Sequence, residues 1–179
     1  MQSDRPSKED YYLNIAKEIG KRGTCRNVQI GAIIVKDDQI ISTGYVGAPR
    51  KTSDCFERGN CLRRELKIPS GQRYELCRSV HAEMNAIINA ARAGVSLLGG
   101  DMYVYGTRFF NGKERLVNAY PCFMCKKMII NAGINKVISM TETGKQKIFI
   151  VEAWREDWRH RDLLDDIELY DTKYDKEEN

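Results

Sequence analysis

Two short motifs constrain the fold and function of this chain more than any other feature of its sequence. The first is His81-Ala82-Glu83 and the second, well downstream, is Pro121-Cys122-Phe123-Met124-Cys125. Imidazole nitrogen and thiolate sulfur are preferred zinc ligands, and two cysteines three residues apart on a helix lie on one face. A Cys-x-x-Cys pair alone would also fit a redox centre or a structural zinc site. The two motifs together predict one zinc ion held by His81, Cys122 and Cys125.

The composition of this ligand set indicates a catalytic zinc site. One histidine and two cysteines leave the fourth tetrahedral position of zinc open for water. The first turn of a helix favours negative charge and thereby lowers the pKa of a thiol, which supplies the thiolates. Two thiolates roughly cancel the charge of the ion, so a nearby base would help to activate the water. Glu83 is the candidate base for a hydrolytic reaction. The ordered pair of motifs resembles the signature of the zinc deaminases, and this resemblance implies hydrolytic removal of an exocyclic amino group from a nucleobase.

Apolar periodicity and turn residues predict alternating helices and strands. We expect a helix starting at Ser7, a strand hairpin turning at Asp37-Asp38, and helices opening at His81 and at Pro121. The first expected helix starts at Ser7 and ends between Gly20 and Gly23. The other expected helices are a short one near 62–66 within the insert, 81–93, 121–132 and 154–164, and the expected strands are 29–35, 40–45, 102–105, 136–140 and 147–151. Residues 107–119 read as a loop or hairpin. This alternation predicts an α/β sandwich around a single sheet.

Length and charge limit the remaining possibilities. The 179 residues suit one zinc-dependent domain over 1–179, with an irregular insert at about 47–80 and a frayed, charged tail at about 170–179. The 29 basic and 25 acidic residues give a net charge of only +4, which argues against a nucleic acid as the main partner. The sequence shows neither a signal-peptide pattern nor an apolar run of membrane-spanning length. We therefore expect a cytoplasmic protein with reduced thiols and no membrane partner.

Residues from about 12 to 137 resemble the deoxycytidylate (dCMP) deaminase family, within the cytidine/deoxycytidylate deaminase superfamily. The segments that carry the resemblance are Ile30-Gly31-Ala32-Ile33-Ile34-Val35, Gly44-Tyr45-Val46-Gly47-Ala48-Pro49, 77–87 and 122–134. The resemblance implies a three-layer α/β/α sandwich around one mixed sheet, as in cytidine deaminases. It implies that His81, Cys122 and Cys125 hold the catalytic Zn2+, that Glu83 shuttles the proton, and that the backbone N–H of Ala82 bonds the pyrimidine carbonyl.

The implied reaction is dCMP and water giving dUMP and ammonia, in a homo-oligomer that dCTP and dTTP regulate as effectors. Val46 departs from the family, which commonly has an asparagine there to bond the sugar hydroxyl. This departure keeps open another free nucleotide, nucleoside or base as substrate, CMP and dCTP included. An editor of tRNA or single-stranded DNA and a non-catalytic zinc module are further alternatives.

A nucleotide substrate also needs cations to hold its phosphate away from the metal. Arg26 is the first candidate because it stands just before the first strand, in a loop that the family places near the substrate. The other candidates are Arg50, Lys51, Arg108, Lys113 and Arg115. Solvated surface charge is the alternative for each of them.

Four cysteines remain outside the two motifs, namely Cys25, Cys55, Cys61 and Cys77. Three of them lie in the polar insert, which has little apolar content of its own, so a metal ion would replace a core there. We therefore consider a second, structural zinc held by these four thiolates. Free buried thiols are the alternative.

Overall fold

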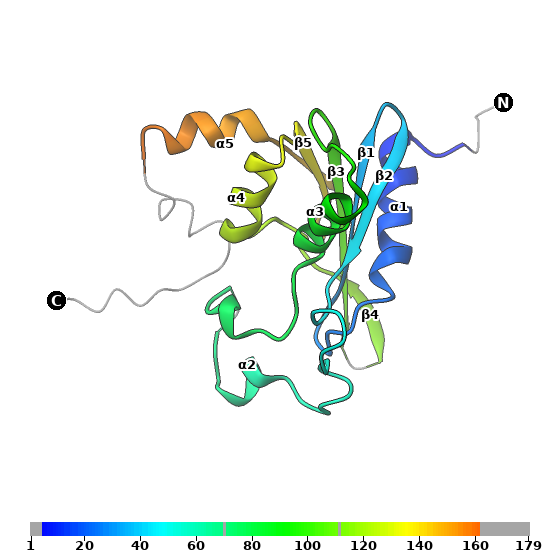
Figure 1. Cartoon of the computed structure of the whole chain (residues 1–179). Coiled ribbons are helices and arrows are strands. Elements are labelled where there is room, and N and C mark those ends of the chain that lie inside the picture. Colours follow the sequence, from blue (N-terminus) through cyan, green and yellow to red (C-terminus); the bar gives the residue numbers. More distant parts are fainter. Residues whose placement is uncertain (1–4, 70, 111, 162–179) are drawn as a thin grey trace.

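The computed structural model describes residues 5–69, 71–110 and 112–161 (Figure 1). Its centre is a six-stranded sheet made of β1 (Gln29–Lys36), β2 (Gln39–Tyr45), β3 (Asp101–Phe110), β4 (Lys113–Leu116), β5 (Lys136–Met140) and β6 (Gln146–Ile150). The strand order is β2-β1-β3-β5-β6, and β4 pairs with β3. β3 and β5 run parallel, whereas the other neighbours are antiparallel. The sheet is therefore mixed, as predicted.

Helices cover both faces of this sheet. The helical elements are α1 (Lys8–Gly20), α2 (Leu62–Glu65), the 3-10 turn η1 (Tyr74–Leu76), α3 (Ala82–Ala93), α4 (Phe123–Asn131) and α5 (Val151–Trp158). α1 packs on one face, and α3, α4 and α5 lie on the other (Figure 1). This arrangement confirms the three-layer α/β/α sandwich.

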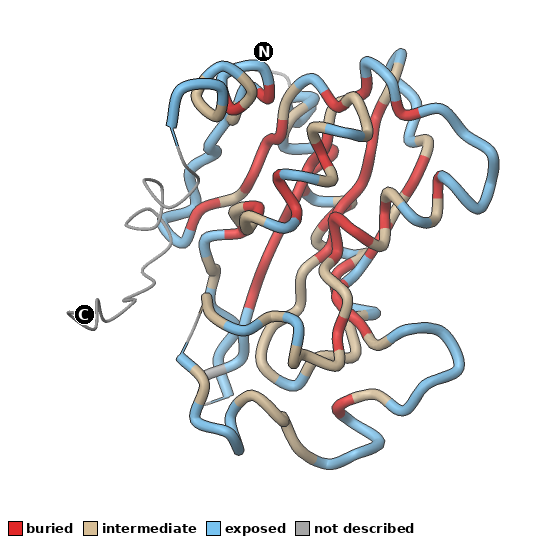
Figure 2. The backbone as a smooth tube through the Cα atoms, turned by 60° about the vertical axis from the view of Figure 1, so that its left-hand side comes forward, coloured by how far each residue is buried: buried red, intermediate tan, exposed pale blue. Residues whose placement is uncertain are grey.

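Strand alternation divides the apolar core between the two faces. Along β1, Ala32 and Ile34 join the core beneath α3 and α4, while Ile33 and Val35 join the core beneath α1. This is the period-two pattern expected of a strand covered on both sides. Figure 2 shows the resulting buried strands between more exposed helices and loops.

Local sequence signals set the first elements. The Ser7 side chain accepts a hydrogen bond of 3.0 Å from the backbone N–H of Asp10, which caps α1 as predicted. Asp37 and Asp38 both adopt positive φ, of 49° and 61°, and so form the two-residue turn that joins β1 to β2. The predicted hairpin is confirmed.

The irregular insert forms a long connection between β2 and α3. Gly47 and Val80 close its base through a pair of backbone hydrogen bonds of 2.8 and 3.1 Å. α2 and η1 lie within the insert, beyond one end of the sheet (Figure 1). Its two ends are thus held together immediately before the first motif begins.

Some boundaries differ from the expected ones. α4 begins at Phe123, two residues after the predicted start at Pro121, because the backbone of Cys122 is extended, with ψ of 171°. α5 begins at Val151 and ends at Trp158, earlier than expected at both ends, while the predicted tail at 170–179 lies outside the described residues. Within the described ranges, every helix is too short or too polar to cross a bilayer.

Candidate metal and catalytic centre

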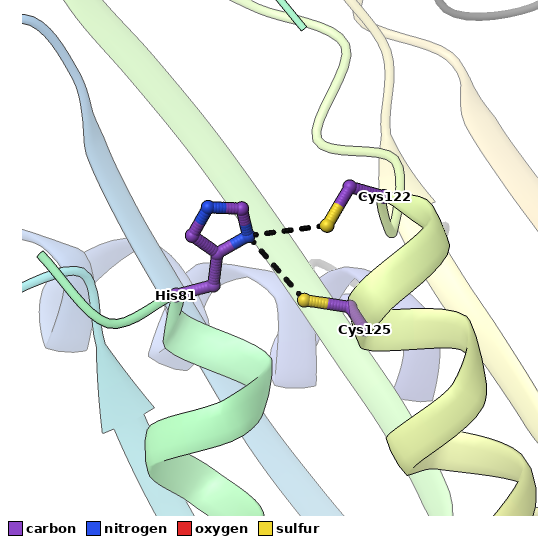
Figure 3. A group of neighbouring side chains, drawn as sticks. All are labelled: His81, Cys122 and Cys125. Carbon is purple, nitrogen blue, oxygen red and sulfur yellow. Dashed lines mark hydrogen bonds between the residues drawn. The ribbon is translucent and has the colours of Figure 1, made fainter. Parts of the chain in front are cut away.

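Two helix starts place the three predicted zinc ligands side by side. His81 is the N-cap residue of α3, Cys122 is the N-cap residue of α4, and Cys125 lies in the first turn of α4. Both helices pack on the same face of the sheet and present these ends toward each other (Figure 3). The side chains are therefore carried by regular elements, which fix their separation.

The geometry of this cluster fits one metal ion. The Nδ1 atom of His81 lies 3.4 Å from the sulfur of Cys122 and 3.4 Å from that of Cys125 (Figure 3). The three ligand atoms all lie within 4.8 Å of one another, and in the described part of the chain no other group of three or more such ligands does so. A nitrogen and two sulfurs that converge in this way form the donor set that zinc prefers.

The two thiols have opposite tendencies to ionise. Cys125 donates a hydrogen bond to the sulfur of Cys122, and this bond, with that from His81, lowers the pKa of Cys122 to about 4 against the opposing effect of burial. The same shared hydrogen bond, together with burial, raises the pKa of Cys125. The pair therefore already carries one thiolate near neutral pH, which favours binding of a cation.

Glu83 lies buried beside this cluster. Glu83 is only 5% exposed, and this burial raises the pKa of its carboxyl group above the ordinary value. A carboxyl group with a raised pKa can take up and release a proton closer to neutral pH, as an acid–base catalyst must. The position of Glu83 thus suits the predicted proton shuttle.

The cluster opens into a cavity of about 380 Å³, which lies in the size range of small-molecule sites. His81, Glu83 and Cys122 line it, together with Ala82 and Val46 of the predicted substrate contacts. Val46 is buried, and its side chain offers no hydrogen-bonding group. Arg26, the first candidate for the phosphate, is exposed and is not among the lining residues.

Sequence reasoning missed several residues of this cavity. Of the predicted phosphate candidates only Arg108 lines it, whereas Arg63 and Arg64 of the insert also do so. Asn27 and Tyr74 are further lining residues that the motifs did not indicate. No spacing signal could have found Arg63, Arg64 and Tyr74, because their place in the cavity lining depends on how the irregular insert folds back.

The four remaining cysteines also gather around this cavity. Cys25, Cys55, Cys61 and Cys77 all line it. Asn27 links two of them, because its backbone N–H donates to the sulfur of Cys25 over 3.4 Å and its side-chain amide donates to that of Cys61 over 3.3 Å. The four sulfurs are not as close together as the ligands of the first site, and all are free thiols here.

Comparisons with known proteins agree with this geometry. A deoxycytidylate deaminase of Mycobacterium phage D29 is 33% identical over 144 residues, which cover 78% of this chain and 98% of that protein. One of Schizosaccharomyces pombe is 31% identical over 137 residues, which cover 76% of this chain but only 38% of the yeast protein. The crystal structure of dCMP deaminase from the cyanophage S-TIM5, in apo form, matches with a TM-score of 0.54 and 25% identity, over 78% of this chain and 86% of that one.

A family profile gives the most general match. The profile described as the cytidine and deoxycytidylate deaminase zinc-binding region matches residues 6–141, a range that includes both motifs and the insert that precedes the first of them. The chain therefore belongs to the cytidine and deoxycytidylate deaminase family.

Proposed function

We propose that this protein hydrolyses the exocyclic amino group of a free cytosine nucleotide, with dCMP and water giving dUMP and ammonia. The observation that carries the proposal is the convergence of His81, Cys122 and Cys125 next to the buried Glu83, in a cavity of small-molecule size. The phage and yeast relatives, which are 33% and 31% identical to this chain over the aligned residues, are named deoxycytidylate deaminases.

The side chains of the site divide the reaction between them. A zinc ion held by His81, Cys122 and Cys125 supplies Lewis-acid activation of water when it is bound. Glu83 accepts the proton of the attacking water and delivers it to the amino group at C4 of the cytosine. The second proton of the water passes to ring nitrogen N3, so that the water oxygen remains on C4 as a carbonyl while the C–N bond breaks to release ammonia. The backbone N–H of Ala82, in the first turn of α3, donates to the pyrimidine carbonyl.

Val46 supports a second candidate substrate within the same reaction class. Its apolar side chain lines the cavity where family members commonly carry an asparagine for the sugar hydroxyl. A site without that hydrogen bond would discriminate less between dCMP and CMP, and dCTP belongs to the same group of alternatives.

Ammonia release from a panel of cytosine and adenine compounds tests the reaction and its substrate. We expect dCMP to give the highest kcat/KM among nucleobases, nucleosides, mononucleotides, dCTP and a single-stranded oligonucleotide. Glu83→Gln should lower kcat by about 10²–10⁴-fold while zinc content and fold persist, since only the proton acceptor is lost. Glu152→Gln, an exposed change on α5, is the matched control. Full activity of Glu83→Gln would refute the mechanism.

We further propose that Cys25, Cys55, Cys61 and Cys77 close around a second, structural zinc ion. Their presence in the lining of the same cavity and the hydrogen bonds from Asn27 to two of them support this proposal. Freshly purified protein should then contain two zinc ions per chain, and Cys61→Ser should contain one and remain active. One ion per chain in the unmodified protein would refute this second site.

Assembly and location complete the proposal. We infer a cytoplasmic homo-oligomer, formed by one domain over 1–179, that responds to dCTP and dTTP at a site separate from the cavity. Light scattering with and without each nucleotide tests the assembly. A monomer under all conditions would refute it.

A further inference from the structure

The cavity concentrates buried polar atoms that have no partner. In the described part of the chain, four buried side-chain nitrogen or oxygen atoms lack a hydrogen bond, and three of them belong to cavity-lining residues. These three are Oδ1 of Asn27, Nε of Arg63 and Oγ of Ser79. Unpartnered buried polar groups are costly and rare in folded proteins, so their concentration in one cavity indicates a polar ligand that completes them.

Arg63 is the charged member of this set, and its guanidinium group is held in place. Its Nη2 atom donates to the backbone carbonyls of Pro69 and Gln72, over 2.8 and 2.6 Å. The guanidinium carbon also lies 4.6 Å from the centre of the Tyr74 ring, in a cation–π contact. These contacts orient the group before any ligand arrives and leave its Nε–H free to donate.

Tyr74 connects Arg63 to the metal site. The ring of Tyr74 meets the imidazole of His81 edge-on, with 4.7 Å between the ring centres. One aromatic ring therefore separates the guanidinium group from a zinc ligand. In a nucleotide the sugar likewise separates the phosphate from the base, so a cation placed near but not at the metal suits a phosphate.

The charged residues that line the cavity favour an anionic ligand. Arg63, Arg64 and Arg108 line the cavity, whereas Glu83 is its only acidic residue among those the structure describes. Glu83 belongs to the proton shuttle and is buried next to the zinc ligands. Apart from the cysteines of the two proposed metal sites, the charged side chains in the rest of the lining are therefore cations, which attract a phosphate monoester more than a neutral nucleoside.

We propose that Arg63 is the specificity-determining residue for the 5′-phosphate of the substrate, which its free Nε–H binds. The proposal rests on the proposed function, because it names the residue that distinguishes a nucleotide from a nucleoside at the same site. Arginine suits this task because its planar fork matches phosphate geometry and stays charged at every physiological pH.

Kinetics with dCMP and deoxycytidine, which differ only in the phosphate, test this assignment. Arg63→Ala should lower kcat/KM for dCMP by about 10- to 150-fold, the range of a charge-assisted hydrogen bond, chiefly through a higher KM. The value for deoxycytidine should stay the same. Arg63→Lys keeps the charge but lacks the Nε–H. Its kcat/KM for dCMP should lie between the values of the unmodified protein and of Arg63→Ala. The control is Arg58→Ala, which removes an exposed charge of the same insert that does not line the cavity.

A purely structural role for Arg63 predicts a different outcome. If Arg63 only braced Tyr74 and the insert, Arg63→Ala would lower kcat/KM for both substrates equally, and the proposal would be wrong. Calorimetric binding of dUMP and deoxyuridine gives a readout that needs no turnover. An unmodified protein that deaminates no cytosine compound, yet loses dUMP affinity selectively on Arg63→Ala, would refute the proposed reaction and retain the phosphate site.

Discussion

Gly44 allows α3 to approach the sheet closely, and replacing it by alanine should displace the metal ligands. A Cβ atom at Gly44 would lie 2.3 Å from the backbone oxygen of Ala82 and 2.3 Å from the backbone nitrogen of Ala86. Ordinary contacts of a Cβ atom begin at 3.4 Å. Because both neighbours are backbone atoms, no side chain can rotate away, and α3 has to withdraw from β2 by about 1 Å.

The withdrawal affects chemistry as well as stability. His81 and Glu83 move with α3, whereas Cys122 and Cys125 stay with α4. A misplacement of about 1 Å in a catalytic site can cost about 10²-fold in rate, and overpacking a core costs about 1–3 kcal/mol. We therefore expect Gly44→Ala to lower the free energy of unfolding by about 1–3 kcal/mol and to weaken zinc binding and kcat by about 10²-fold.

Urea unfolding, zinc competition titration and kcat measure these three effects. Gly94→Ala is the control, because Gly94 ends the same helix with φ of 68° and a Cβ there would meet no atom within 4 Å. It should cost about 1–2 kcal/mol through backbone strain, with zinc affinity and kcat unchanged. If Gly44→Ala bound zinc and turned over like the unmodified protein, the depth of α3 against β2 would not position the ligands, and the reasoning would fail.

Three further predictions follow from the cores and the metal site. Leu13→Ala, in the buried face of α1, should lower the free energy of unfolding by about 2–5 kcal/mol with kcat retained, as urea unfolding and kinetics would show, because a fully buried side chain is lost outside the cavity lining. A chelator should abolish activity and lower Tm, and added zinc should restore both, since the ion joins α3 to α4. In metal-free protein, the lowered pKa of Cys122 contributes stability that is present above the ordinary thiol pKa of 9.0 and is lost as the pH falls through about 4. Thiolate ultraviolet absorbance should therefore persist to about pH 4 and be absent in Cys122→Ser.

The sequence predicted those parts of the fold that local signals determine. Ser7 capped α1, Asp37-Asp38 turned the hairpin, and His81 opened α3, because each depends on interactions within a few residues. The clustering of His81, Cys122 and Cys125 was predictable for a different reason, since the two motifs together match a known zinc-site signature. The start of α4 could not be predicted to the residue, because a proline such as Pro121 fits both the first helical turn and the extended segment before it.

The substrate wall of the cavity lay beyond sequence reasoning. Arg26 precedes β1 as expected but is exposed, while Arg63, in the short helix expected near 62–66 of the insert, packs on Tyr74 and lines the cavity. Which cation of a polar insert turns inward depends on tertiary contacts such as the carbonyls of Pro69 and Gln72. The spacing of residues along the chain does not predict those contacts.

The division of the apolar interior by the sheet has a consequence for how this protein can change. Replacements in the core beneath α1 change the free energy of unfolding and leave the reacting groups where they are, since none of the predicted metal ligands belongs to that layer. Replacements in the core on the opposite side shift α3 or α4, so a change in packing there also changes the catalytic rate. Evolution or a protein engineer can therefore adjust heat tolerance on one side independently, while the other side tolerates only paired, compensating substitutions.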